Sequence, residues 1–259
     1  MAGFKIPVFE RGTVLTQEML ETLKSYAIDL ATLEYAGYED GIISGCQVSM
    51  SGNMIYVNRG IIKYAGNIYF LPHEFKVMAN SGNQWQILRM HVGSMSRDTN
   101  FMIGELNLEI SSELSAASNK IEICRFRLQG GAILRNQYRD FNDLSTEFDT
   151  INEIHAQWSG YQCKSISNRI LQEYARELQK KNSQNMHDMV FVQQIMMLNG
   201  KTMARNAILY YISQRLNRPM KEMSNEEIYK ALQEILRTSR PVGNGPSNGM
   251  REMRRIIVD

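Results

Sequence analysis

A chain of 259 residues is long enough to bury one large hydrophobic core or two smaller ones. Hydrophobic residues make up 43% of it and charged residues 22%, the ordinary balance of a soluble globular protein. The net charge of +2 excludes a strong overall attraction to nucleic acid or to a membrane surface. The sequence has no long uninterrupted apolar run, so we expect no transmembrane helix.

The N-terminal residues lack the apolar core of a signal peptide, so we expect a protein that is made in the cytoplasm. The three cysteines, Cys46, Cys124 and Cys163, are widely spaced and include no C-x-x-C pair. They predict buried free thiols rather than a disulfide framework. The 17 methionines, several of them within 186–203, suit either a core or an adaptable partner surface, and core packing is the favoured interpretation.

Residues 1–14 are predicted to be extended, because Pro7 disfavours a helix and Gly12 punctuates the segment. A helix should follow, with Thr16 capping its N-terminus and Gly37 ending it in a left-handed conformation. Its apolar residues recur at helical spacing, which predicts an amphipathic helix. They are Met19, Leu23, Tyr26, Leu30 and Leu33.

Residues 41–71 contain three short β-prone runs separated by turns. Ser51-Gly52-Asn53 and Gly66-Asn67 supply residues that tolerate positive φ, which tight hairpin turns require. The stretch therefore predicts a compact β-meander. It holds no charged cluster, no nucleophile–base pair and no metal-ligand spacing, which favours a mounting module over an active site.

Further strands are predicted at 85–92, 101–110 and 121–128, with a brief pairing at Phe75–Met78. Alternation of apolar and polar residues along these segments is typical of antiparallel strands with one buried face. The N-terminal part of the chain is therefore predicted to be a helix followed by a mainly antiparallel β domain.

Beyond residue 140 the spacing of apolar residues becomes helical. Helices are predicted over 144–158, from Ile166 to Leu178, and over 186–216, where Asn199-Gly200 can interrupt the last of these. Ser224-Asn-Glu-Glu227 is a capping box and predicts one more helix after it. The predicted fold class is therefore α+β, with an N-terminal helix plus a mainly antiparallel β domain followed by an α-helical domain.

The predicted division is a helix plus β-meander domain at 1–140, a helical domain at 141–237, and a flexible linker with a docking tail at 238–259. The linker is rich in Gly, Pro, Asn and Ser, and the residues after it are basic and apolar. Such an apolar triplet suits docking on a partner, for instance by adding a strand to a sheet edge, with simple disorder as the alternative. The candidate partner-docking residues are Arg254, Arg255, Ile256, Ile257 and Val258.

The sequence points to no catalytic, cofactor-binding or metal-binding residue. Gly200-Lys201-Thr202 resembles the end of a phosphate-binding loop, but Ile195 stands where that loop needs its first glycine, which favours a break between helices. The four histidines are scattered and have no metal-ligand spacing, so they are interpreted as structural. They are His73, His91, His155 and His187.

Three stretches, the first two joined by the predicted helix, carry a family resemblance. They are Phe9-Glu10-Arg11-Gly12-x-x-Leu15, Gly41-Ile-Ile-Ser-Gly45-Cys-x-Val48 and Val57-x-x-Gly60-Ile-x-x-x-x-Gly66-x-Ile68. In this order they resemble the N-terminal segments of baseplate and tail-fibre-mounting proteins of bacteriophages and of phage-tail-like contractile particles, including bacteriocins.

This resemblance implies a structural baseplate component that acts through protein–protein contacts, in several copies of a symmetric assembly, without catalysis or cofactor. It also implies that the final location of the protein is a phage-like particle. Fibre repeats and collagen-like stalks, which are usual in this family, are missing from the sequence, so an internal baseplate piece is favoured over a receptor-binding one.

Two other functions stay open. A regulatory or nucleic-acid-associated protein would use the helical half, since residues 144–259 carry 16 basic and 12 acidic residues. An enzyme such as a hydrolase would assemble its site from distant residues. It would show a deep polar pocket with strongly shifted carboxylates.

Overall fold

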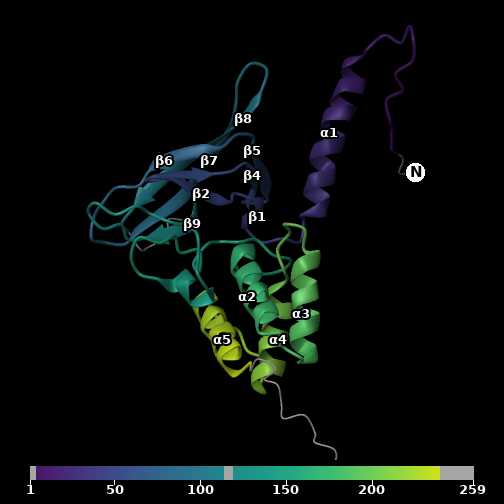
Figure 1. Cartoon of the computed structure of the whole chain (residues 1–259). Helices are drawn as coiled ribbons and strands as arrows, with labels where there is room; N and C mark the ends of the chain where they lie inside the picture. Colours follow the sequence, from purple (N-terminus) through teal and green to yellow (C-terminus); the bar gives the residue numbers. More distant parts are fainter. Residues whose placement is uncertain (1–3, 114–118, 240–259) are drawn as a thin grey trace, which may run out of the picture.

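The computed structural model describes residues 4–113 and 119–239 (Figure 1). An N-terminal helix, α1 (Gln17–Glu34), precedes a set of antiparallel strands, and helices follow. This order confirms the predicted α+β class. The strands are β1 (Gly41–Gly45), β2 (Val48–Ser51), β3 (Met54–Val57), β4 (Gly60–Tyr64), β5 (Asn67–Leu71), β6 (Phe75–Met78), β7 (Gln86–Arg97), β8 (Met102–Ser111) and β9 (Lys120–Phe126).

Within the described ranges the strands form three antiparallel sheets, in the orders β1-β4-β5, β2-β3-β6 and β8-β7-β9. Residues 41–71 are therefore not one meander, as the sequence predicts, but are shared between two sheets. The reason is local, because Gly45 (φ 70°) and Cys46 (φ 52°) turn the chain out of the first sheet after β1. The predicted hairpin turns are confirmed by the positive φ of Gly52 and Gly66.

Glycines of the family resemblance bring backbones into close contact. Gly45 of β1 pairs with Gly60 of β4. An added Cβ at Gly60 would lie 2.6 Å from the Ser44 oxygen and 2.6 Å from the Cys46 nitrogen. At Gly41 it would lie 2.7 Å from the carbonyl oxygen of Gln157, which belongs to a segment far along the chain. These positions are needed for packing of the β domain.

Gly60→Ala should therefore destabilise the protein by about 2 kcal/mol, because the methyl group forces two backbone strands apart. Gly82→Ala is the matched control, since an added Cβ there has, among the described atoms, one neighbour within 4 Å, the Gln86 Nε2 atom at 3.9 Å. Urea unfolding of both variants measures the difference. Equal free energies of unfolding for the two variants would contradict this account of Gly60.

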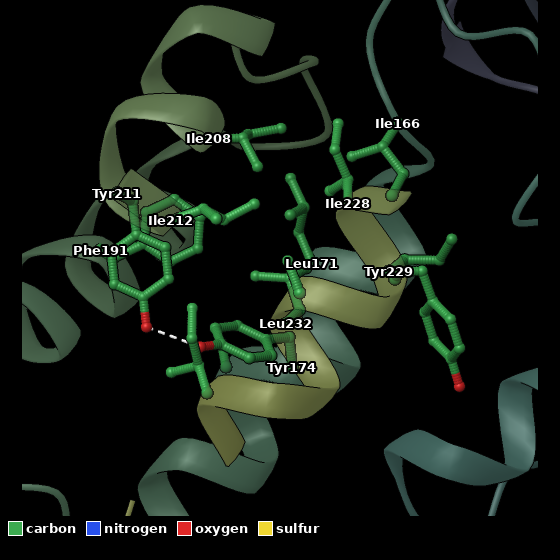
Figure 2. Packing of buried hydrophobic residues seen from close by; sticks show 14 of the residues in the cluster. Ile166, Leu171, Tyr174, Phe191, Ile208, Tyr211, Ile212, Ile228, Tyr229 and Leu232 are labelled. Atoms are coloured by element: carbon green, nitrogen blue, oxygen red, sulfur yellow. Dashed lines mark hydrogen bonds between the residues drawn. The ribbon is translucent and has the colours of Figure 1, made fainter. Parts of the chain in front are cut away.

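The helical half forms its own hydrophobic cluster (Figure 2). It contains α2 (Asn168–Lys180), α3 (Met186–Met197), α4 (Arg205–Leu216) and α5 (Asn225–Thr238), which confirms the helices predicted after residue 166. The rings of Phe191 and Tyr211 stack with centroids 3.8 Å apart, and the hydroxyl groups of Tyr174 and Tyr211 lie 2.6 Å apart. The capping box of α5 is present, with Ser224 and Glu227 bonded reciprocally.

The helix predicted over 144–158 is wrong. A short 3-10 helix covers Phe141–Ser145, and the following residues are irregular. The periodic apolar residues arise because this segment passes between two cores. Leu144 and Ile154 join the helical cluster, whereas Ile151 and Trp158 join the cluster of the β domain. Their spacing imitates one helical face although they point into different cores.

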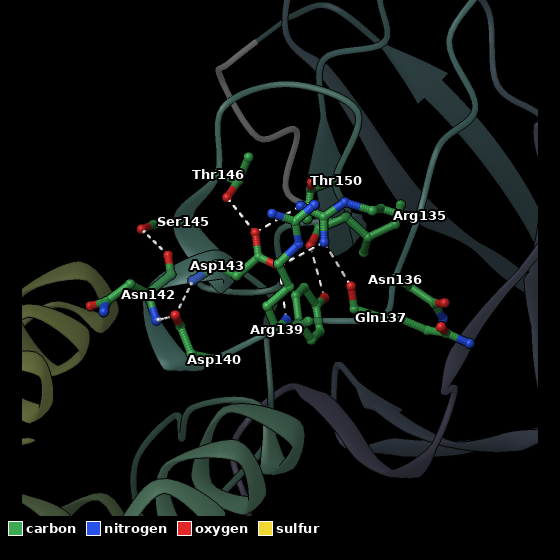
Figure 3. A network of polar contacts seen from close by, with 12 residues as sticks. Arg135, Asn136, Gln137, Arg139, Asp140, Asn142, Asp143, Ser145, Thr146 and Thr150 are labelled. Carbon is green, nitrogen blue, oxygen red and sulfur yellow. Dashed lines mark hydrogen bonds and ion pairs between the residues drawn. The ribbon is translucent and has the colours of Figure 1, made fainter.

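Polar contacts hold the start of this irregular segment (Figure 3). The Arg135 guanidinium donates to both carboxylate oxygens of Asp143, over 2.6 and 2.7 Å. Thr146 also donates to Asp143, over 2.7 Å, and Asp140 accepts from the backbone nitrogen of Asn142. Side chains thus satisfy backbone and charged groups here in place of a regular helix.

Asp143→Asn should lower the free energy of unfolding by about 2 kcal/mol at pH 7, because a bidentate charge-assisted pair is lost. The Arg135 guanidinium holds the pKa of the Asp143 carboxyl below its ordinary value of 3.8. The stabilisation is therefore complete well above that value and is lost as the pH falls through and below it. Urea unfolding at pH 7 and pH 3 measures this, and a deficit of equal size at both pH values would contradict it.

Candidate protein–protein interface

Helix α1 projects from the rest of the molecule (Figure 1). Thr16 caps it as predicted, with its hydroxyl oxygen accepting from the Met19 nitrogen over 3.2 Å. None of the residues of α1, all of which the structure describes, is buried. Six large apolar side chains of α1 are between 52% and 75% exposed: Leu20, Leu23, Tyr26, Ile28, Leu30 and Leu33.

The arm formed by residues 4–15 adds to this uncovered surface. It is irregular and returns along α1 (Figure 1). Lys5 of this arm forms a 2.6 Å ion pair with Glu18 of α1. Its apolar side chains are more than half exposed: Phe4, Ile6, Val8, Phe9, Val14 and Leu15. An amphipathic helix and an apolar arm with no core beneath them mark an interaction surface, since soluble monomers rarely leave such an area open.

Lys63 fixes the base of α1 to the β domain. Its ammonium group donates to the carbonyl oxygens of Tyr35, Ala36 and Tyr38, over 2.7, 3.0 and 2.8 Å. Lys63 itself is only 7% exposed. The first two carbonyls follow the last turn of α1, where a cation also interacts favourably with the helix dipole.

Two further contacts complete the base of α1. Glu34 forms a 3.2 Å ion pair with Lys201, which lies between α3 and α4. Gly37 does not end the helix in a left-handed conformation as predicted, because α1 ends at Glu34 with Tyr35 as its cap. Gly37 is needed instead for a close approach, since an added Cβ would lie 2.4 Å from the ring of Tyr161. The helix is thus held firmly at one end.

Methionines form a second exposed apolar surface on α3. Met186, Met189, Met196 and Met197 are more than half exposed, whereas Met203 is buried. The core interpretation of the methionines at 186–203 is therefore wrong for most of them. Helix α3 is apolar on several faces and buries only the one that carries Asp188, Phe191 and Ile195. Flexible methionine side chains on a surface suit contact with irregular partners.

The residues of the loop that resembles a phosphate-binding motif make structural contacts. Lys201 pairs with Glu34, and Gly200 (φ 83°) lies in the break between α3 and α4, which confirms the helix-break interpretation. In ranges 4–113 and 119–239, no group of three or more His, Cys, Asp or Glu is arranged to hold a metal ion. Over the same ranges, no helix is both long and apolar enough to cross a membrane.

A polar cleft of about 380 Å³ lies beside α2, and one wall is Glu153. Burial raises the pKa of this carboxyl. One of its oxygens accepts from Ser167 over 2.7 Å and the other faces Arg169 over 3.4 Å. Ser167 is also the cap of α2. The shifted carboxylate that an enzyme would need is present, but both of its oxygens are engaged in holding α2 to the preceding segment.

The candidate tail residues Arg254, Arg255, Ile256, Ile257 and Val258 lie outside the described residues. Sequence reasoning missed the surface that the structure does describe. Heptad-like spacing in α1 and the methionines of α3 were visible, but both patterns fit a buried face equally well.

No protein-family model matches the sequence, and no curated protein matches it. Three solved structures align with this chain at low TM-scores. A chain of the type VI secretion TssK–TssF–TssG baseplate subcomplex aligns with a TM-score of 0.45 and 10% identity, over 91% of this chain and all 100% of that one. The crystal structure of TssK aligns with a TM-score of 0.39 and 10% identity, over 90% of this chain and 71% of that one. A chain of the baseplate complex from the type VI secretion system aligns with a TM-score of 0.35 and 10% identity, over 93% of this chain and 71% of that one.

Proposed function

We propose that the chain is a structural component of a phage-tail-like contractile baseplate and acts through protein–protein contacts in several copies. The observation that carries the proposal is the uncovered apolar surface of α1 and of the arm at 4–15. A free monomer gains nothing from a projecting helix whose apolar side chains face water. An assembly component that buries these side chains against a partner gains the hydrophobic free energy of each one.

The family resemblance supports the same function, because residues 9–68 include most of the arm and all of α1. The glycines of this stretch are explained by close backbone contacts and turns, so they build the base on which α1 is mounted. In this role residues 1–140 form the mounting part and residues 141–237 the helical part. Within residues 238–259, the part beyond Ser239 supplies the docking tail, because Thr238 ends α5 and Ser239 is its cap. The contact residues are Arg254, Arg255, Ile256, Ile257 and Val258.

Purification of the tagged protein from its native cell, followed by mass spectrometry and negative-stain microscopy, tests the proposed function. We expect sheath and tube proteins to co-purify in tail-like particles. The same purification in 0.5 M salt is the control for nucleic acid, since DNA retention would be lost as salt rises. A protein that purifies without tail proteins, with no particles in the images, would refute the proposal.

Deletion of residues 240–259 should leave the melting temperature of the purified protein nearly unchanged and block its incorporation into particles. The cut must follow Ser239, because its hydroxyl group accepts from Arg215 over 3.0 Å and donates to the carbonyl oxygen of Ile235 over 2.8 Å. Calorimetry and the particle purification described above measure the two effects. A fall of several degrees in melting temperature would show that the tail packs on its own chain.

A further inference from the structure

We draw no further inference here: the strongest candidate, the groove of about 450 Å³ between α4 and α5, combines an apolar floor with a rim of both basic and acidic side chains, and nothing in the residues that the structure describes shows what covers it.

Discussion

Asp188→Ala should lower the free energy of unfolding by about 3–5 kcal/mol, because it breaks a buried ion pair from one side. The Asp188 side chain is only 1% exposed, and it accepts from the Arg215 Nε atom over 2.5 Å. It also accepts from the hydroxyl groups of Tyr211 and Ser183, over 2.7 and 2.5 Å. The substitution leaves a nearly buried guanidinium and two hydroxyl donors without their acceptor.

The position of Asp188 explains why the loss should spread through the helical half. Asp188 lies on α3, while Tyr211 and Arg215 lie on α4, and Ser239 at the end of α5 accepts from Arg215. One carboxylate therefore joins three helices through hydrogen bonds within an apolar cluster. Tyr174 of α2 joins this hydrogen-bond network because its hydroxyl group contacts the hydroxyl group of Tyr211.

Urea unfolding measures this effect, and Glu226→Ala is its control. Glu226 forms an exposed pair with Lys230 on α5, and such a surface pair contributes about 1 kcal/mol or less. If Asp188→Ala lowered the free energy of unfolding by no more than Glu226→Ala does, the buried network would contribute nothing to stability. Circular dichroism should show that the variant stays helical at low temperature.

Local signals in the sequence predicted the elements that depend on neighbouring residues. Thr16 and Ser224 cap helices because the bonds they make close within three residues of the chain. Gly52 and Gly66 make hairpin turns for the same reason. These features need no knowledge of the rest of the fold, so the pattern alone identifies them.

The errors lie where a pattern has two physical solutions. The apolar spacing over 144–158 is helical, yet its residues divide between two cores that exist only in the folded chain. The regularly spaced Leu23, Tyr26, Leu30 and Leu33 of α1 and the methionines of α3 suggest a buried face, but they are exposed to solvent. The helical spacing of apolar residues indicates that one face of a helix is apolar. It does not show whether residues of the same chain bury that face. The candidate interface therefore emerged only from burial in the folded structure.

Lys63→Met should lower the free energy of unfolding by about 2–4 kcal/mol and loosen α1 at its base. Methionine keeps the unbranched stem of lysine and lacks only its terminal ammonium group, so most of the loss comes from the charged donor rather than from packing. Three carbonyl groups, those of Tyr35, Ala36 and Tyr38, lose their shared partner. Hydrogen bonds from charged groups contribute more than neutral ones, and unsatisfied acceptors near a helix end carry a further cost.

Lys24→Met is the control, because Lys24 lies on the exposed surface of α1. This substitution removes the same charge and leaves the contacts at the base of α1 unchanged. Hydrogen exchange and limited proteolysis at 35–38 should show faster opening in Lys63→Met than in Lys24→Met. Unchanged protection at 35–38 would mean that Glu34–Lys201 and the Gly37–Tyr161 contact hold α1 without Lys63.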